Sequence, residues 1–350
     1  MRVCGNLLSP VVRQKWCVCS AAKGAFFVTT LKTLFVITVS TVRFFMPGTP
    51  AAMNLPDGAK QPGTKSFNVE VVSNVEAGSG ARATVSLPEG FKIAGPVDMA
   101  FDNNAMKAAA NAPGKKTKLL EYWGSGREIT GIQPKVTVSD GKQPADEGSL
   151  KLPDKSYAYW PTETTKPISA ASVQGTYGIK TSFCGNSSVT LSKEQDHLDP
   201  IDITNTDGDT DLTKPIVVRW KPVANAAGYI LKAYGGDGSQ TITWTSSPDL
   251  EAARTIEYRA LGKDDVEKYL KTGVLIPSYV ASCTIPAGIF KGSASVMLVM
   301  IAVGKDIVQT DGDTQTSVIV RSTASAPLYS SPYTPPADLT DAPKDKAERK

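Results

Sequence analysis

The sequence predicts a mainly β protein with two β-rich domains, the second of them a sandwich with a short helical insertion. The chain has 350 residues, 41% hydrophobic and 21% charged, which is enough material for about two globular domains. Its 29 glycines and 24 prolines follow no collagen-like period and favour many turns. Short segments that alternate apolar and polar residues recur along the chain, as strands buried on one face do.

The first part of the chain, residues 1–53, is expected to be a leader. It holds six basic residues and no acid, Arg2, Arg13, Lys15, Lys23, Lys32 and Arg43. The apolar run Thr33 to Val42 falls short of the ~20 residues that span a bilayer but suits a signal-peptide core. We therefore expect export to the periplasm, the cell surface or the medium, with processing near Ala52. Two alternatives stay open: a start codon placed too far upstream, and an uncleaved anchor beginning at Gly24. In the second case the leader would be the only membrane contact.

Charge in the rest of the chain is almost balanced. The whole sequence has 38 basic and 34 acidic residues, and the basic excess lies entirely in the leader. Nucleic-acid binding needs a basic stripe, so DNA and RNA are not expected partners.

A linker, 54–65, is followed by the first β-rich domain, 66–191. Alternation predicts strands at 67–71 and 83–87, which form a hairpin, and at 118–123, 135–138, 157–160, 175–183 and 187–191. Residues 102–112 are expected to form one short helix that ends at Pro113-Gly114.

An acidic linker, 192–213, leads to the second domain, 214–325. Its expected strands are 216–220, 229–234, 241–245, 283–285, 296–303 and 317–321, with a helical insert at 264–271. The apolar run 296–303 indicates a central strand buried on both faces, with 317–321 as its neighbour. The tail 326–350 is proline-rich and charged and is expected to stay disordered.

Reactive residues are scarce. The single histidine, His197, lies in the acidic linker and is expected to be solvated, so most imidazole-based catalysis and every histidine-rich metal site are excluded. Gly124-Ser125-Gly126 lacks the spacing of a phosphate loop. Cys184 and Cys283 are a disulfide candidate for a secreted chain, which would contribute about 4–5 kcal/mol on the chain-entropy model. Two separate buried thiols are the alternative.

Two constellations are candidate binding sites. The first is an aromatic platform for a glycan, made of Tyr122, Trp123, Tyr157, Tyr159 and Trp160; such residues also serve as ordinary core packing. The second is a duplicated Thr-Asp-Gly-Asp-Thr at 206–210 and 310–314. If both copies lie at one pole of the sandwich, five carboxylates could hold Ca²⁺, namely Asp207, Asp209, Asp211, Asp311 and Asp313. The alternative is that Asp-Gly forms a hairpin turn twice.

Residues 215–323 resemble a fibronectin type III-like sandwich, with Trp220 in one strand and Tyr229 and Leu231 in the next. No tyrosine stands in the run 296–303, where such domains usually have one. The stretches Tyr122-Trp123-Gly124, Trp220-Lys221-Pro222-Val223, Trp244-Thr245-Ser246-Ser247 and 282–290 also resemble an uncharacterised group of exported proteobacterial proteins, which carries cysteine in place of Ser125. This resemblance implies export and a two-part layout, and it transfers no catalytic residue.

These observations favour an exported, non-enzymatic binding or structural protein of the cell envelope or extracellular space. Its expected partner is another envelope protein or a glycan. The alternative is a carboxylate-dependent hydrolase such as a glycoside hydrolase, which needs two acids and no histidine. Two carboxyl groups about 5–10 Å apart in an aromatic-lined cleft would distinguish the hydrolase.

Overall fold

The computed structural model describes residues 17–19, 28–45, 63–102, 117–139, 155–162, 165, 172–205, 210–236, 239–293 and 295–329. Within these residues the protein is mainly β, which confirms the predicted fold class. The predicted helix at 102–112 lies almost wholly outside the described residues, as does the predicted tail beyond Tyr329. No helix in the described part of the chain has the length and apolar character needed to cross a membrane.

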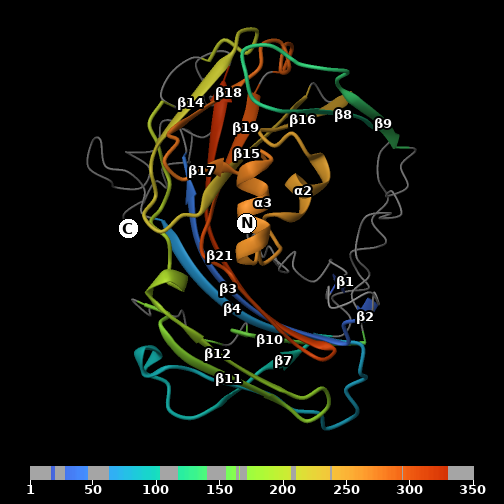
Figure 1. Ribbon diagram of the computed structural model, residues 1–350, viewed down its shortest axis with the longest axis vertical. Coiled ribbons are helices and arrows are strands. Elements are labelled where there is room, and N and C mark those ends of the chain that lie inside the picture. Colours follow the sequence, from blue (N-terminus) through green and yellow to red (C-terminus); the bar gives the residue numbers. More distant parts are fainter. Residues whose placement is uncertain are drawn as a thin grey trace, which may run out of the picture.

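One long curved sheet organises the molecule (Figure 1). It has 12 strands. Its main path runs, in order, through β7 (Ala100–Phe101), β10 (Ser156–Trp160), β4 (Thr64–Ser73), β3 (Thr33–Phe44), β21 (Thr314–Tyr329), β19 (Ser295–Val303), β15 (Gly228–Gly236), β16 (Gln240–Thr245), β8 (Thr117–Trp123) and β9 (Lys135–Ser139). Two short strands lie off this path, with β17 (Ile276–Pro277) on β15 and β20 (Ile307–Asp311) on β21. Neighbouring strands are antiparallel except β3 with β21 and β16 with β8, which are parallel.

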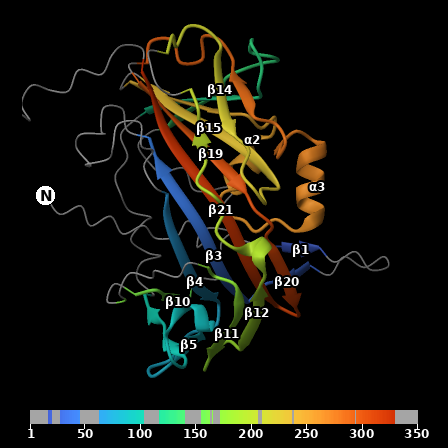
Figure 2. The same cartoon turned by 90° about the vertical axis from the view of Figure 1, so that its left-hand side faces the viewer.

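Two smaller sheets cover the convex face of the long sheet, one near each end (Figures 1 and 2). The four-stranded sheet consists of β12 (Asn186–Leu191), β11 (Gly175–Thr181), β5 (Ala83–Ser86) and β6 (Val97–Asp98). The three-stranded sheet consists of β13 (Asp202–Ile203), β14 (Ile216–Lys221) and β18 (Ser282–Ile285). A separate pair, β1 (Cys17–Cys19) and β2 (Val28–Thr30), is antiparallel.

A single apolar core lies between the long sheet and both small sheets, because alternate side chains of each strand point to this face. At one end Phe67 stacks on Tyr177 with ring centroids 5.1 Å apart. At the other end Trp220 meets Tyr229 edge to face at 5.4 Å. Burying a large apolar side chain contributes about 1.5–3 kcal/mol, so this shared core holds the three sheets together.

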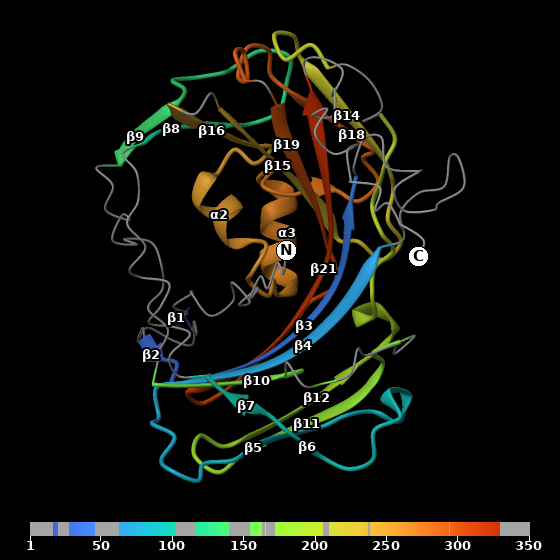
Figure 3. The same ribbon diagram turned by 180° about the vertical axis from the view of Figure 1, so that it is seen from behind.

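The concave face carries the helical insertion, α2 (Leu250–Thr255) and α3 (Lys263–Lys271), seen from both sides in Figures 1 and 3. The predicted helix at 264–271 is thereby confirmed. Asp249 caps α2 by accepting hydrogen bonds from the backbone N–H groups of Glu251 and Ala252, each 3.0 Å long. The insertion packs on Ile230 of β15 and on Ile301 and Val303 of β19.

The predicted burial of the run 296–303 is confirmed where the helices cover it. Strand β19 lies between β21 and β15, and residues 300–303 are buried on both faces. Nearer Ser295 the strand alternates between buried and exposed residues. Its neighbour is β21, as expected, but β19 pairs with residues 321–329 and not with 317–320.

The apolar run Thr33 to Val42, predicted to be a signal-peptide core, lies in strand β3, in the middle of the long sheet. It pairs with β21 on one side and β4 on the other. Phe35, Ile37 and Val39 are buried completely in the main core. Processing near Ala52 would therefore remove a central strand.

The predicted division of the body at 192–213 does not divide the long sheet, because strands from both proposed domains pair in it. The described part of 192–213 is also not an exposed linker. Leu198, Ile201, Ile203 and Leu212 are buried in the core, and Asp202 and Ile203 form β13. The hairpin predicted for 67–71 and 83–87 is likewise wrong, because β4 and β5 belong to the two sheets that face each other.

Candidate functional site

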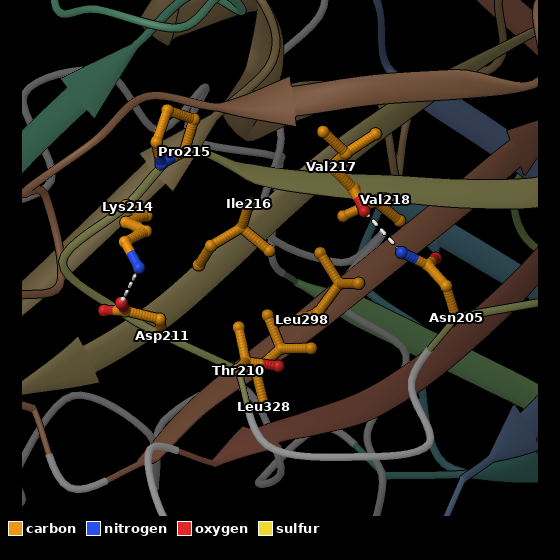
Figure 4. Close-up of a pocket in the computed structure, with 10 residues that line it drawn as sticks. All are labelled: Asn205, Thr210, Asp211, Lys214, Pro215, Ile216, Val217, Val218, Leu298 and Leu328. Carbon is orange, nitrogen blue, oxygen red and sulfur yellow. Dashed lines mark hydrogen bonds and ion pairs between the residues drawn. The ribbon is translucent and has the colours of Figure 1, made fainter.

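A pocket of about 290 Å³ opens between the three-stranded sheet and the long sheet (Figure 4). Its apolar lining comes from Ile216 and Val218 of β14, Leu298 of β19 and Leu328 of β21. Each of these four side chains is at most 8% exposed, since each also belongs to the core. The alternation of the three strands therefore places aliphatic groups at the bottom of the pocket.

A charged rim borders this apolar floor. The Lys214 ammonium group lies 2.9 Å from a carboxylate oxygen of Asp211, and both side chains are drawn in Figure 4. Asp211 also accepts hydrogen bonds from the Thr213 hydroxyl and, at 3.0 Å, from its backbone N–H. The hydrogen bonds from Thr213, together with Lys214, lower the pKa of Asp211 to about 2. The rim thus presents a paired negative and positive charge at neutral pH.

Asn205 closes the opposite side of the pocket. Its amide nitrogen donates to the Val217 carbonyl at 2.5 Å, and its amide oxygen accepts from the Arg219 N–H at 2.8 Å. The side chain thus continues the pairing of β13 along β14 after the backbone of β13 turns away. Thr210 lies between this amide and the Asp211–Lys214 pair.

A second hollow, of about 360 Å³, lies at the ends of β15, β19 and β21. Tyr234, Met297 and Pro327 contribute its side chains, and Gly235 and Gly236 contribute backbone. A Cβ at Gly235 would lie 2.9 Å from the Phe290 ring, so this glycine is needed for packing. The hollow has no charged lining residue, and the first pocket is the better candidate for specific binding.

The described members of the predicted calcium site are not brought together. Asp207 and Asp209 lie outside the described residues. Asp211 is near Leu328, at the end of β21, whereas Asp311 and Asp313 precede Thr314, where β21 begins. At about 3.3 Å per residue these ends are separated by roughly 45 Å of strand. In the described residues no group of three or more metal-ligating side chains comes together.

The predicted aromatic platform is not assembled either. Tyr122 and Trp123 are on β8, whereas Tyr157, Tyr159 and Trp160 are on β10, near the other end of the long sheet. Trp160 packs in the core against Phe67, and the Tyr157 hydroxyl donates to Glu70 at 2.8 Å. The period-two alternation of β10 sends its aromatic residues to opposite faces, so packing explains them.

Cys184 and Cys283 are free thiols, so the pairing that the sequence allowed is not formed. Cys184 accepts or donates a hydrogen bond with Thr181 at 3.3 Å, at the end of β11. Cys283 is on β18, where burial raises the pKa of its thiol to about 12 although Ser125 hydrogen-bonds to it. The two thiols thus lie in different parts of the fold, Cys184 in the turn between β11 and β12 and Cys283 on β18.

His197 is not a solvated linker residue. It is half-buried, and its Nδ1 lies 3.2 Å from the Ser40 carbonyl of β3. Burial, reinforced by the nearby charge of Lys65, lowers the pKa of His197. The residue therefore joins the segment after β12 to the long sheet as a neutral imidazole.

Three acidic side chains on the concave face, Glu257, Glu121 and Glu251, have basic partners, which bears on the hydrolase alternative. Glu257 lies 3.1 Å from Lys232. Glu121 and Glu251 both contact Arg254, so a guanidinium lies between these two carboxylates. A two-carboxylate hydrolase instead needs a sugar between its acids and one acid protonated. These ion pairs favour a structural role for the acids.

The pocket residues were missed by the sequence analysis, with the exception of Asp211. Strands β14, β19 and β21 were predicted, but their pairing was not, and the pocket exists only where the end of β21 meets the start of β14. The short spacing from Asp211 to Lys214 was the available signal, because it suits a turn closed by an ion pair.

No protein-family model matches the chain, and no curated protein matches its sequence.

Proposed function

We propose that the chain is an exported, non-enzymatic binding or structural protein of the cell envelope or extracellular space. Its sandwich contacts a partner protein through the pocket beside Asp211 and Lys214. The observation that carries this proposal is the combination of an aliphatic floor with a charged rim. Binding sites commonly combine an apolar surface with a few polar groups that set orientation.

The chemistry of the floor favours a protein over a glycan. Leucine, isoleucine and valine side chains accept an aliphatic side chain of a partner, whereas the aromatic residues expected to stack on a sugar are dispersed. The Asp211–Lys214 pair can exchange partners with charged groups of the same protein at the rim. Three strands packed on four, β13–β14–β18 on β16–β15–β19–β21, also support the resemblance to a fibronectin type III-like sandwich.

A capture experiment tests the pocket. The purified chain is immobilised and exposed to envelope proteins, cell-wall fractions and a glycan panel. Thr210→Phe fills the pocket, and Lys214→Glu replaces the cation of the rim with a second carboxylate. Lys271→Glu, on the exposed end of α3, is the matched control. We expect one protein to bind the wild type and Lys271→Glu equally. Both pocket variants should bind it at least about tenfold more weakly, which corresponds to ~1.4 kcal/mol.

Equal capture by all four proteins would overturn the role of the pocket, and retention of glycans alone would overturn the choice of partner. Release of sugars from any glycan by the wild type would overturn the non-enzymatic assignment. Fractionation of the source cells tests export, because a cytosolic chain would contradict it. N-terminal sequencing of the exported chain should find β3 retained, since this strand belongs to the core.

A further inference from the structure

Strand β9 forms one end of the long sheet (Figures 1 and 3). Over the described residues it pairs only with β8, in an antiparallel register that places Leu120 opposite Val136. A strand at the end of a sheet presents backbone N–H and C=O groups that can pair with another strand. β9 therefore has the geometry of a strand acceptor.

Exposed apolar side chains lie on β9 and in the segment that precedes it. Of the ten exposed large hydrophobic residues in the described chain, four are Ile129, Ile132, Val136 and Val138. Val136 is 51% exposed and Val138 is 73% exposed. Val136 and Val138 lie on the same face of the sheet as Leu120 of the neighbouring strand β8. Leu120 is partly buried against the main core. The apolar face of the sheet thus continues past the part that the small sheet covers. Natural edge strands are usually blunted by charges or proline. In β9 these features are confined to its start, at Pro134 and Lys135, and residues 136–139 carry neither.

We propose that β9 pairs antiparallel with β9 of a second copy of this chain, about a two-fold axis at Thr137. This register is the one in which each Val136 faces Val138 of the other copy, so that two aliphatic cross-strand pairs form. Registers centred one residue away would place valine against valine only once. Lys135 falls at opposite ends of the pairing in the two copies, so no two lysines face each other. The edge is therefore complementary to itself, as an interface with two-fold symmetry requires.

The contact is expected to be weak. Five residues of strand and the adjacent isoleucines bury less than the ~1,200 Å² of a standard stable interface. Two aliphatic cross-strand pairs add only modestly to the backbone hydrogen bonds, so dimerisation should depend on concentration. This inference does not depend on the proposed function, because the pocket is formed by β14, β19 and β21 and none of them is at this edge.

The two-fold axis gives a specific test, because Thr137 lies opposite itself. Sedimentation velocity of the full chain over a concentration series should show a weight-average mass that rises towards twice that of the monomer. Thr137→Lys and Thr137→Glu each place like charges face to face, and each should abolish the rise. An equimolar mixture of these two variants should restore it, because lysine then faces glutamate. Thr241→Lys, at an exposed threonine of β16 in the same sheet, should dimerise as the wild type does.

Circular dichroism melting of the variants establishes that each is folded. A wild type that stays monomeric at every concentration would overturn the proposal. So would dimerisation that survives Thr137→Lys, or a mixture of the two charge variants that stays monomeric. Each of these outcomes is independent of whether the Asp211 pocket binds a partner.

Discussion

Arg321 and Asp306 form a buried ion pair at the junction of the long sheet and the helical insertion. The two charged groups are 2.8 Å apart, with side chains 4% and 0% exposed. Arg321 also donates to the carbonyls of Ile256 and Arg259, and Asp306 accepts from the Leu261 N–H at 2.9 Å. The pair thus satisfies the backbone between α2 and α3 and holds this segment against β21.

Removing one partner of this ion pair should lower the stability of the protein. Arg321→Met leaves the Asp306 carboxylate buried without its cation, and we expect a loss of about 3–5 kcal/mol in the free energy of unfolding. Urea denaturation measures it. The double variant Arg321→Met/Asp306→Asn, which buries no lone charge, should recover part of the loss. A single variant as stable as the wild type would show that the pair does not hold the insertion.

His197 should make stability depend on pH in the range below about 6.5, the ordinary pKa of the imidazole. Its folded pKa is lowered by burial, so the unfolded chain binds a proton more readily below the ordinary value of about 6.5. Stability therefore falls as pH drops through this window. Because His197 is the only histidine, His197→Asn should flatten the melting temperature against pH there. An unchanged slope in the variant would contradict this assignment.

Ser125 and Cys283 are in hydrogen-bond contact, so a thiol at position 125 would lie close to the Cys283 sulfur. We expect Ser125→Cys to form a disulfide with Cys283 under oxidising conditions. The loop is long, so the chain-entropy model gives about 4–5 kcal/mol of stabilisation. Thiol titration and melting with and without dithiothreitol measure it, with Ser125→Ala as the control. A variant that keeps both thiols reactive would contradict the predicted geometry.

At the scale of elements, β3 is the strand whose removal should matter most. It separates β21 from β4 and so joins the parts of the long sheet on its two sides. Loss of Phe35, Ile37 and Val39 alone removes about 5–9 kcal/mol of stabilisation by apolar burial. This amount is comparable with the whole free energy of unfolding of a typical domain. A chain that begins at Asn54 should show no cooperative unfolding by circular dichroism, whereas a chain that begins at Val28 should. A stable fold from Asn54 onward would show that β3 is dispensable.

The length of β21 separates Asp211 from Asp313, two of the predicted calcium ligands. Asp211 lies near one end of this strand, and Asp313 precedes the other end and is paired with Lys32 at 2.7 Å. A single cation could not contact both Asp211 and Asp313. We therefore expect the melting temperature to be the same in excess Ca²⁺ and in EDTA. A rise of several degrees in Ca²⁺ would instead point to ligands supplied by one copy of the repeat.

At the scale of the molecule, local alternation was enough to predict most strands and the mainly β class. The run around Met300 was placed correctly in a central strand because it carries no charge. Pairing could not be predicted, because the partners of β3, β8 and β21 are fixed by contacts between distant parts of the chain. The same limit explains the dispersed aromatic residues and the unpaired Cys184 and Cys283. The pocket was missed for this reason too, since its floor and rim come from separate regions.

The parallel pairing of β3 with β21 joins residues close to opposite ends of the described chain, from Thr33 beside Thr314 onward. β3 emerges early during synthesis, but one of its two neighbours emerges last. Closing so large a loop before any contact forms is entropically expensive and slows folding. Phe35, Ile37 and Val39 are therefore exposed to solvent for much of synthesis and folding. We expect the yield of folded protein to depend on a chaperone that binds this segment.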